Sequence, residues 1–251
     1  MAPTDRPGAR PPHPPLRDYY PGESARRSWV RGVFNRTAGD YDRVERAMSA
    51  GSGPWYRRQA LLRAGLAPGM QVLDVATGTG LVAKEAVQIV GPEGAVVGAD
   101  PSLGMIAAGA LPSSIRAVGA AAERLPFADA RFDFLSMGFA LRHVADLAAV
   151  FAEFARVLKP GGRVCILEIT RPAGRLGMLA LKGYMRGIVP LVARVVGREA
   201  ETAQLMRYYW DTIQACVPPA EVMTLLKDAG FTGVERYVEL GIFSEYRAVR
   251  D

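Results

Sequence analysis

Two aspartates and a glycine-rich loop carry the clearest chemical signal in this chain. Residues 72–80 read VLDVATGTG, in which an apolar strand ends at Asp74 and a loop with Gly78 and Gly80 follows. An alanine-rich helix is expected to begin at Leu81. A glycine loop lets backbone N–H groups approach a ligand, and the following helix offers its positive N-terminus. In a parallel sheet this arrangement makes a nucleotide-type site at the carboxyl edge of the strands.

The glycine motif is compatible with more than one nucleotide. Gly78, Gly80 and Ala83 satisfy the G-x-G-x-x-G/A spacing, so NAD is one candidate. Three features favour S-adenosylmethionine: Asp74 lies where a cationic aminoacyl group would be met, Asp100 ends the next predicted strand, and no tyrosine has a lysine four residues later, as many dehydrogenases do. A carboxylate at Asp100 can accept hydrogen bonds from both hydroxyls of a ribose, which NAD also carries. The plainest alternative is a tight strand-to-helix turn with two solvated aspartates.

The composition bounds the kind of protein. The 251 residues, 49% of them hydrophobic, suit one large α/β domain with an inserted cap. No uninterrupted run of eighteen apolar residues occurs, so we expect no transmembrane helix, and the N-terminus lacks the apolar core of a secretory signal. The net charge of +6 is dispersed, which favours a solvated basic surface first, contact with anionic lipid second, and nucleic acid last.

Histidine and cysteine are scarce. Cys165 and Cys216 are far apart and have no metal-like spacing, and His13 and His143 are the only histidines. We therefore expect no metal site, and a reducing cytoplasm as the compartment.

The order of elements predicts a doubly wound, mostly parallel, seven-stranded α/β sheet. Residues 1–22, rich in proline and arginine, are expected to form a disordered arm, and residues 23–251 the domain. The first helix is expected to run from Ser24 to about Phe34, and a second helix near 55–63. Strands are predicted at 70–75, 95–100, 114–118, 131–137, 163–169, 231–238 and 241–249.

A helical insertion is expected at 170–217, before the last two strands. Its apolar face is predicted to comprise Leu176, Leu179, Leu181, Tyr184, Ile188 and Leu191, with arginines and lysine between them. A compact α/β domain does not need this segment, so we expect it to cap the active-site edge as a lid, with docking on a membrane face as a further role. Additional helical core or a contact between two copies is the alternative.

The assembled motifs resemble the methyltransferases that C-methylate the quinone ring in ubiquinone and menaquinone biosynthesis. The similarity begins near Val33 and leaves out only the arm. Two of its motifs, the glycine loop and a Leu-Lys-Pro-Gly-Gly turn, occur in many small-molecule methyltransferases, whereas the segments at 40–42 and 139–144 are more specific to this family. The matching segments are 40–42, 72–80, 123–127, 139–144, 156–162 and a tyrosine-rich stretch at 206–213.

The resemblance implies a Rossmann-like fold, S-adenosylmethionine as cofactor and a set of cofactor-binding positions. Thr79 matches a contact to the aminoacyl end and Asp100 a contact to the ribose, while Ala121 and Ala122 fall where the family frames the adenine. The family usually has Asn or Asp at the position of Ala121 and often has serine at that of Gly138. With Asp74, Gly78 and Gly80, these are the predicted cofactor-binding residues.

The resemblance also implies that Tyr41 and Arg142 border the substrate. Arg142 stays protonated, so it would stabilise a phenolate or position a water rather than act as the base. His143 replaces the family's Asn, and we hypothesise that it accepts the quinol proton. A structural histidine behind Arg142 is the alternative.

The leading functional interpretation is C-methylation of a prenylated quinol or a similar apolar aromatic. The alternatives are O- or N-methylation of another apolar molecule, a different transfer that uses the same cofactor, and a catalytically silent cofactor-binding protein. We expect a cytoplasmic protein that meets an apolar aromatic substrate and does not bind nucleic acid. Contact with anionic membrane and a homodimer remain open.

Overall fold

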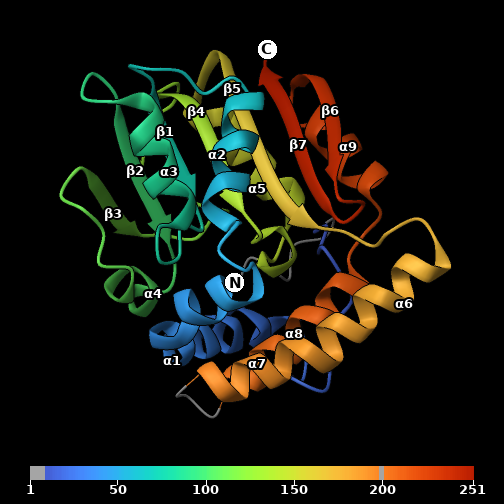
Figure 1. Cartoon of the computed structure of the whole chain (residues 1–251). Coiled ribbons are helices and arrows are strands. Elements are labelled where there is room, and N and C mark those ends of the chain that lie inside the picture. The colour runs from blue at the N-terminus through green and yellow to red at the C-terminus, as the bar shows by residue number, and fades with distance from the viewer. Residues whose placement is uncertain (1–8, 198–200) are drawn as a thin grey trace.

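The computed structural model describes residues 9–197 and 201–251 and is built on one seven-stranded sheet (Figure 1). Strands β1 to β5 run parallel, and β7 pairs antiparallel with both β5 and β6. This confirms the predicted doubly wound, mostly parallel sheet. In spatial order the strands are β3 (Ile115–Gly119), β2 (Ala95–Asp100), β1 (Gln71–Val75), β4 (Phe132–Gly138), β5 (Leu158–Ile169), β7 (Phe243–Arg250) and β6 (Phe231–Glu239).

Helices cover both faces of the sheet, which is why its central strands are apolar on both sides. One face packs against α2 (Gly53–Arg63) and α3 (Leu81–Val90), and the other against α5 (Leu147–Val157) and α9 (Pro219–Asp228). The short α4 (Leu103–Ala108) follows β2. Asp146 caps α5, its carboxylate accepting hydrogen bonds from the N–H groups of Ala148 and Ala149.

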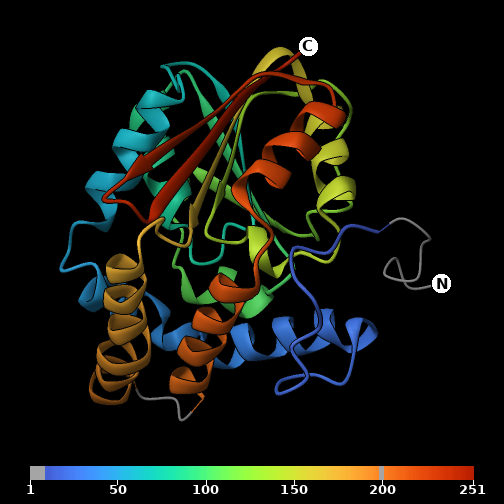
Figure 2. The same cartoon turned by 90° about the vertical axis from the view of Figure 1, so that its right-hand side faces the viewer.

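A third layer of helices lies beneath the carboxyl edge of the parallel strands (Figures 1 and 2). It consists of α1 (Glu23–Met48), α6 (Arg175–Gly183), a π-helical turn (Tyr184–Ile188), α7 (Val189–Val196) and α8 (Thr202–Ala215). A separate apolar cluster holds this layer together, with Trp210 and Tyr208 among its most buried members. The predicted helical insertion is therefore present, and α1 packs with it although the two are far apart in sequence.

The first helix is longer than predicted. We expected it to end at about Phe34, but α1 continues to Met48 through Gly39 and a polar stretch of weak helix propensity. Packing explains the difference, because Val33 and Val44 are buried against the helical layer and stabilise the helix through it.

The predicted disordered arm is wrong for residues 9–22; residues 1–8 lie outside the described part of the chain. His13 and Tyr20 are buried, and the backbone N–H groups of Leu147 and Val217 donate to the carbonyls of Arg10 and Pro12. A proline-rich composition therefore does not prevent this segment from packing along the domain.

The predicted apolar face of the insertion divides in two. Leu181 is buried, whereas Leu176, Leu179, Ile188 and Leu191 are exposed. Among the described residues, one helical stretch, Arg175–Val196, is long and apolar enough to cross a membrane by length and composition, and only 22% of its most apolar window is buried. We did not identify this helix from the sequence, because charged residues interrupt its apolar stretch.

Candidate functional site

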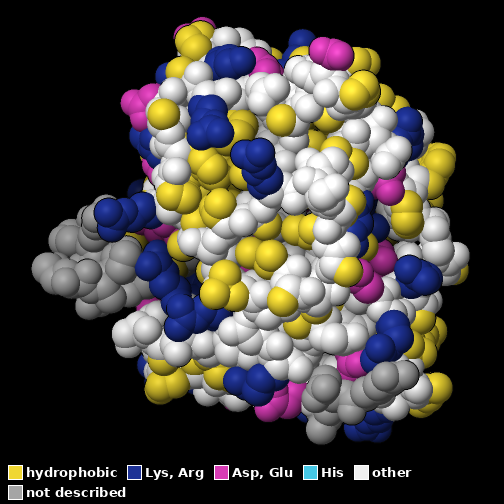
Figure 3. Space-filling model, turned by 90° about the vertical axis from the view of Figure 1, so that its left-hand side faces the viewer, with side chains coloured by type: hydrophobic (Ala, Val, Ile, Leu, Met, Phe, Trp, Pro, Cys, Tyr) yellow, Lys and Arg dark blue, Asp and Glu magenta, His cyan; other side chains and the backbone are white. Residues whose placement is uncertain are grey.

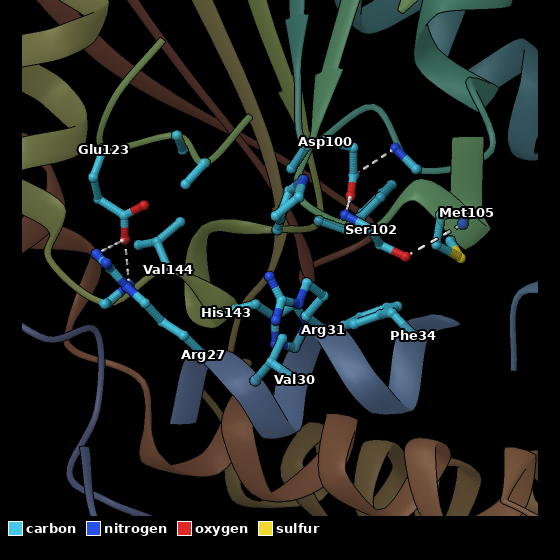
Figure 4. Close-up of a pocket in the computed structure, with 18 of the residues that line it drawn as sticks. Arg27, Val30, Arg31, Phe34, Asp100, Ser102, Met105, Glu123, His143 and Val144 are labelled. Carbon is cyan, nitrogen blue, oxygen red and sulfur yellow. Dashed lines mark hydrogen bonds and ion pairs between the residues drawn. The ribbon is translucent and has the colours of Figure 1, made fainter. Parts of the chain in front are cut away.

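A cavity of about 460 Å³ lies between the carboxyl edge of the sheet and the helical layer (Figure 4). One half of its wall comes from the loops after β1, β2 and β3 and from the end of β4. The other half comes from α1, α8 and the short helix η2 (Leu141–His143). Of the eleven predicted site residues, seven line the cavity: Tyr41, Gly78, Asp100, Ala121, Ala122, Gly138 and His143.

Asp100 is the carboxylate of the sheet-side half. Its Oδ2 accepts a hydrogen bond from the N–H of Gly78 at 2.8 Å, and its Oδ1 accepts one from the N–H of Ser102 at 2.7 Å. Burial raises the pKa of Asp100 to about 6, while these two N–H groups favour the charged form. Each oxygen keeps a lone pair for a ligand, so the side chain suits the two hydroxyls of a ribose.

Asp74 is not where we expected it. The side chain is 1% exposed and lies behind the cavity wall, where Thr77 Oγ1 and Ser136 Oγ donate hydrogen bonds to its two oxygens at 2.7 Å each. It therefore ties the start of the glycine loop to β4 instead of facing a ligand. Because strand residues alternate between faces, the sequence could not show which face this carboxylate takes.

Thr79 and Gly80 also lie outside the cavity lining. Thr79 is 2% exposed and its hydroxyl donates to Asp42, which joins the glycine loop to α1. Gly80 adopts a left-handed conformation (φ 81°) at the start of α3, and a Cβ there would lie 2.2 Å from Leu111 Cδ2. Both residues shape the loop, and the left-handed backbone favours glycine at position 80.

Small residues form the part of the sheet-side wall that Ala121, Ala122 and Gly138 supply, while Met105 and Glu123 also line this half. Ala121 and Ala122 present only methyl groups, and Gly138 ends β4. A Cβ at Gly138 would lie 2.6 Å from Val82 Cγ2. Val82 therefore fills the space that a side chain at position 138 would need. The wall stays packed although Gly138 lacks the hydroxyl group of a serine.

The helix-side half combines aromatic and basic side chains. Phe34, Tyr41 and Tyr209 line it together with His143, and Arg27 and Arg31 of α1 also line the cavity (Figure 4). The imidazole of His143 stacks on the rings of Tyr208 and Tyr209 at centroid distances of 5.4 Å and meets Phe34 edge-on at the same distance. Flat, apolar walls with a few polar groups suit an aromatic ring as ligand.

His143 is the only imidazole on this wall. Its Nε2 is buried and has no hydrogen-bond partner among the described residues, while its Nδ1 lies 3.4 Å from the hydroxyl of Tyr208. Burial and the positive charge of Arg142 hold the pKa of His143 well below its usual value, so the imidazole is neutral at pH 7 and can accept a proton.

The two tyrosines beside it are weak acids. Burial raises the pKa of Tyr41 and of Tyr209, and the two hydroxyls share a hydrogen bond. Protonated phenols in an apolar wall act as hydrogen-bond donors to ligand oxygens.

Arg142 is close to this half but does not reach the cavity. It is 1% exposed, and its guanidinium forms an ion pair with Glu168 and lies 5.1 Å from the ring centre of Tyr209. Its Nε donates to Thr212 Oγ1 at 3.1 Å. Arg142 therefore does not line the cavity, whereas Tyr209, next to its guanidinium, does.

Sixteen of the 23 lining residues were not among the predicted site residues, and two of these have unusual backbones. Ala76 (φ 54°) and Phe139 (φ 59°) have left-handed backbones that non-glycine residues rarely adopt. Such strain gathers at ligand sites, where the surrounding structure maintains it. No side-chain pattern signals it.

Comparisons with known proteins agree with this geometry. The model of the ubiE/COQ5 methyltransferase family matches residues 22–249. The ubiquinone/menaquinone biosynthesis C-methyltransferase UbiE of Pseudomonas putida is 32% identical, and the match covers 91% of each chain.

Solved structures show the same fold at low identity. A possible histamine N-methyltransferase from Thermotoga maritima aligns with a TM-score of 0.62 and 20% identity over 88% of this chain and 100% of its own. A SAM-dependent methyltransferase from Aquifex aeolicus aligns with a TM-score of 0.59 and 20% identity over 84% of this chain and 98% of its own.

Proposed function

Because the chain belongs to the ubiE/COQ5 methyltransferase family and is an enzyme that uses S-adenosylmethionine, we propose that it methylates a ring carbon of a prenylated quinol. The relatives named for this reaction match the chain over almost its whole length. The observation that supports the substrate class is the joining of an aromatic wall to the glycine-loop wall in one cavity.

The sheet-side half is proposed to hold the cofactor. Asp100 would accept hydrogen bonds from the ribose, the methyl groups of Ala121 and Ala122 would pack on the adenine, and the glycine loop at Gly78 would approach the aminoacyl end. When bound, S-adenosylmethionine supplies an electrophilic methyl group, and methylation of a ring carbon leaves one proton for the protein to remove.

The helix-side half is proposed to bind and activate the quinol. The ring would lie against Phe34 and Tyr209, which exclude water, and the phenol of Tyr41 would donate to a ring oxygen. His143 would accept the hydroxyl proton at its unpartnered Nε2, which increases the electron density at the neighbouring ring carbon. After the methyl group is transferred, the proton on that carbon would leave and the ring oxygen would regain one, so that the aromatic quinol is restored and one proton is released in total.

Arg142 is proposed as a positioning residue. Its charge, paired with Glu168 and stacked near Tyr209, fixes that ring and keeps His143 neutral. We further propose that the enzyme works from the cytoplasm at the inner membrane face, where prenylated quinols reside.

A genetic test addresses the substrate. The chain is expressed in a bacterium that lacks its own quinol C-methyltransferase, and the extracted quinones are analysed by mass spectrometry. We expect ring-methylated quinones to return. Unmethylated quinones in cells that contain folded, cofactor-binding protein would contradict the proposal, and a methyl ether would assign O-methylation instead.

A further inference from the structure

The outer surface of the segment 175–196 carries an apolar row that nothing in the described chain covers. It comprises Leu176, Leu179, Ile188, Leu191 and Val195, which are 54–83% exposed. Spacings of three and four residues place Leu191 and Val195 of α7 on one side together with Ile188, the last residue of the π-helical turn, and a spacing of three places Leu176 and Leu179 on one side of α6. The π-helical turn joins the two helices within one continuous rod.

A second row on the same rod is basic. Arg175, Lys182, Arg186 and Arg194 are exposed, and none of them has an ion-pair partner among the described residues. Residues 170–197 contain no Asp or Glu at all. Elsewhere the charges are mixed, as on the face in Figure 3, where acidic side chains lie among the basic ones.

A third row fixes the rod to the protein. Leu181, Met185, Val189 and Ala193 are buried in the cluster that includes α1 and α8. A rod of about 33 Å has the length of a membrane span. It cannot cross a bilayer while one side packs on the domain and lysine and arginines lie along its length. It can lie flat in the interface, with the apolar row inserted and the basic row at the headgroups.

We propose that the α6–α7 rod is a docking surface for an anionic lipid bilayer. Burial of the apolar row and attraction between the basic row and acidic headgroups would act together. A second copy of the chain is the poorer occupant, because it would bring two uncompensated basic rows together. The proposal extends beyond the methylation reaction and does not depend on turnover, so either can fail alone.

Co-sedimentation of the full chain with vesicles tests the docking surface. Vesicles of phosphatidylcholine alone are compared with vesicles that also contain phosphatidylglycerol. We expect binding to the anionic vesicles to be at least about tenfold stronger, since each basic residue near such a surface contributes about 1 kcal/mol. High salt is expected to weaken it, because it shortens the Debye length. Absent binding, or equal binding to both vesicles, would overturn the proposal.

Paired variants locate the contact. Leu191→Gln is expected to weaken binding about tenfold, and Lys182→Glu at least about fivefold. Leu103→Gln, on α4, and Arg116→Glu, on the opposite edge of the sheet, change similarly exposed residues and are expected to bind as the parent does. The assignment of the rod to lipid would be contradicted if each control variant lost as much vesicle binding as the rod variant it is matched with. A dimer in solution that Leu191→Gln dissociates would also contradict it.

Discussion

The two halves of the cavity are built in different ways. The sheet-side half uses loops that directly follow strands, and its polar contacts come largely from backbone N–H groups around Asp100. The helix-side half uses side chains from α1, η2 and α8, and brings Tyr41 next to Tyr209 across most of the chain. A cofactor that many enzymes use needs only the sheet-side wall, whereas the helix-side wall selects the substrate. Changes confined to one half should therefore affect one ligand and leave the other unchanged.

The largest effect is expected from the helix-side half. His143→Asn removes the proposed base and should lower kcat about a hundredfold, while affinity for S-adenosylhomocysteine stays unchanged. In the parent, activity should fall only well below pH 6.5, because the pKa of His143 is held below that value. Turnover measured against pH checks both points.

A matched variant separates chemistry from packing at this position. Tyr208→Phe keeps the ring that stacks on His143 and should retain activity to within about tenfold. An active His143→Asn variant with an unshifted acidic limb would assign the histidine a structural role.

The corresponding change in the sheet-side half is Asp100→Asn. It replaces an ionised acceptor with an amide that faces two N–H donors, so affinity for S-adenosylhomocysteine should fall about ten- to a hundredfold. The KM for the quinol should change little. Titration calorimetry measures the affinity for S-adenosylhomocysteine, and steady-state kinetics measure the KM for the quinol. An equal effect on both would contradict the assignment of one ligand to each half.

Gly138→Ser tests how tightly the sheet-side wall is packed. The new Cβ meets Val82, so the free energy of unfolding should drop by about 1–3 kcal/mol. Adding Val82→Ala opens the space and should recover part of the loss. Denaturant titration of both variants checks the coupling, which would be disproved if the two effects were simply additive.

The ionisation of Asp100 determines whether cofactor binding strengthens or weakens as pH changes. Its pKa is raised from 3.8 to about 6, and hydrogen bonds from a ribose favour the ionised form. Binding should therefore release protons near pH 6 and weaken as pH falls below 6. Calorimetry in buffers of different ionisation enthalpy measures this release, which Asp100→Asn should abolish.

The same carboxylates affect the stability of the free protein. Asp74 and Asp100 both have pKa values raised to about 6 by burial, so the folded state binds more protons than the unfolded state between pH 3.8 and 6. Their contribution to stability therefore falls as pH rises through this window.

The smallest effect is expected at Ala76. Its left-handed backbone disfavours any residue with a Cβ, so Ala76→Gly should raise the free energy of unfolding by up to about 1 kcal/mol. Thermal melts check it. A loss of stability would show that the alanine methyl makes packing contacts that outweigh the strain.

The contrast between the halves also explains what the sequence could predict. The strands were predicted to within a few residues at most ends, because apolar runs and glycine turns are local signals. Asp100 and Gly78 followed from the same signals, whereas Gly138 was predicted from the family resemblance alone. The C-terminal part of α1 and the packing of His13 were missed, because both depend on contacts with the helical layer.

Side-chain direction was the second kind of information that the sequence lacked. Asp74 and Arg142 were placed at the correct edge of the sheet, yet both point away from the cavity, toward Ser136 and Glu168 respectively. Position along a strand or turn is a local property, whereas the partner of a buried charge is set by the whole fold.

Transfer of a deuterated methyl group tests the central claim most directly. The purified enzyme is incubated with labelled S-adenosylmethionine and a reduced prenylated quinol that lacks its ring methyl, and the product is examined by mass spectrometry and NMR. We predict that the label appears on a ring carbon, at a rate that His143→Asn lowers and Tyr208→Phe largely preserves. A label on oxygen or nitrogen, or no transfer by enzyme that binds both ligands, would contradict the account.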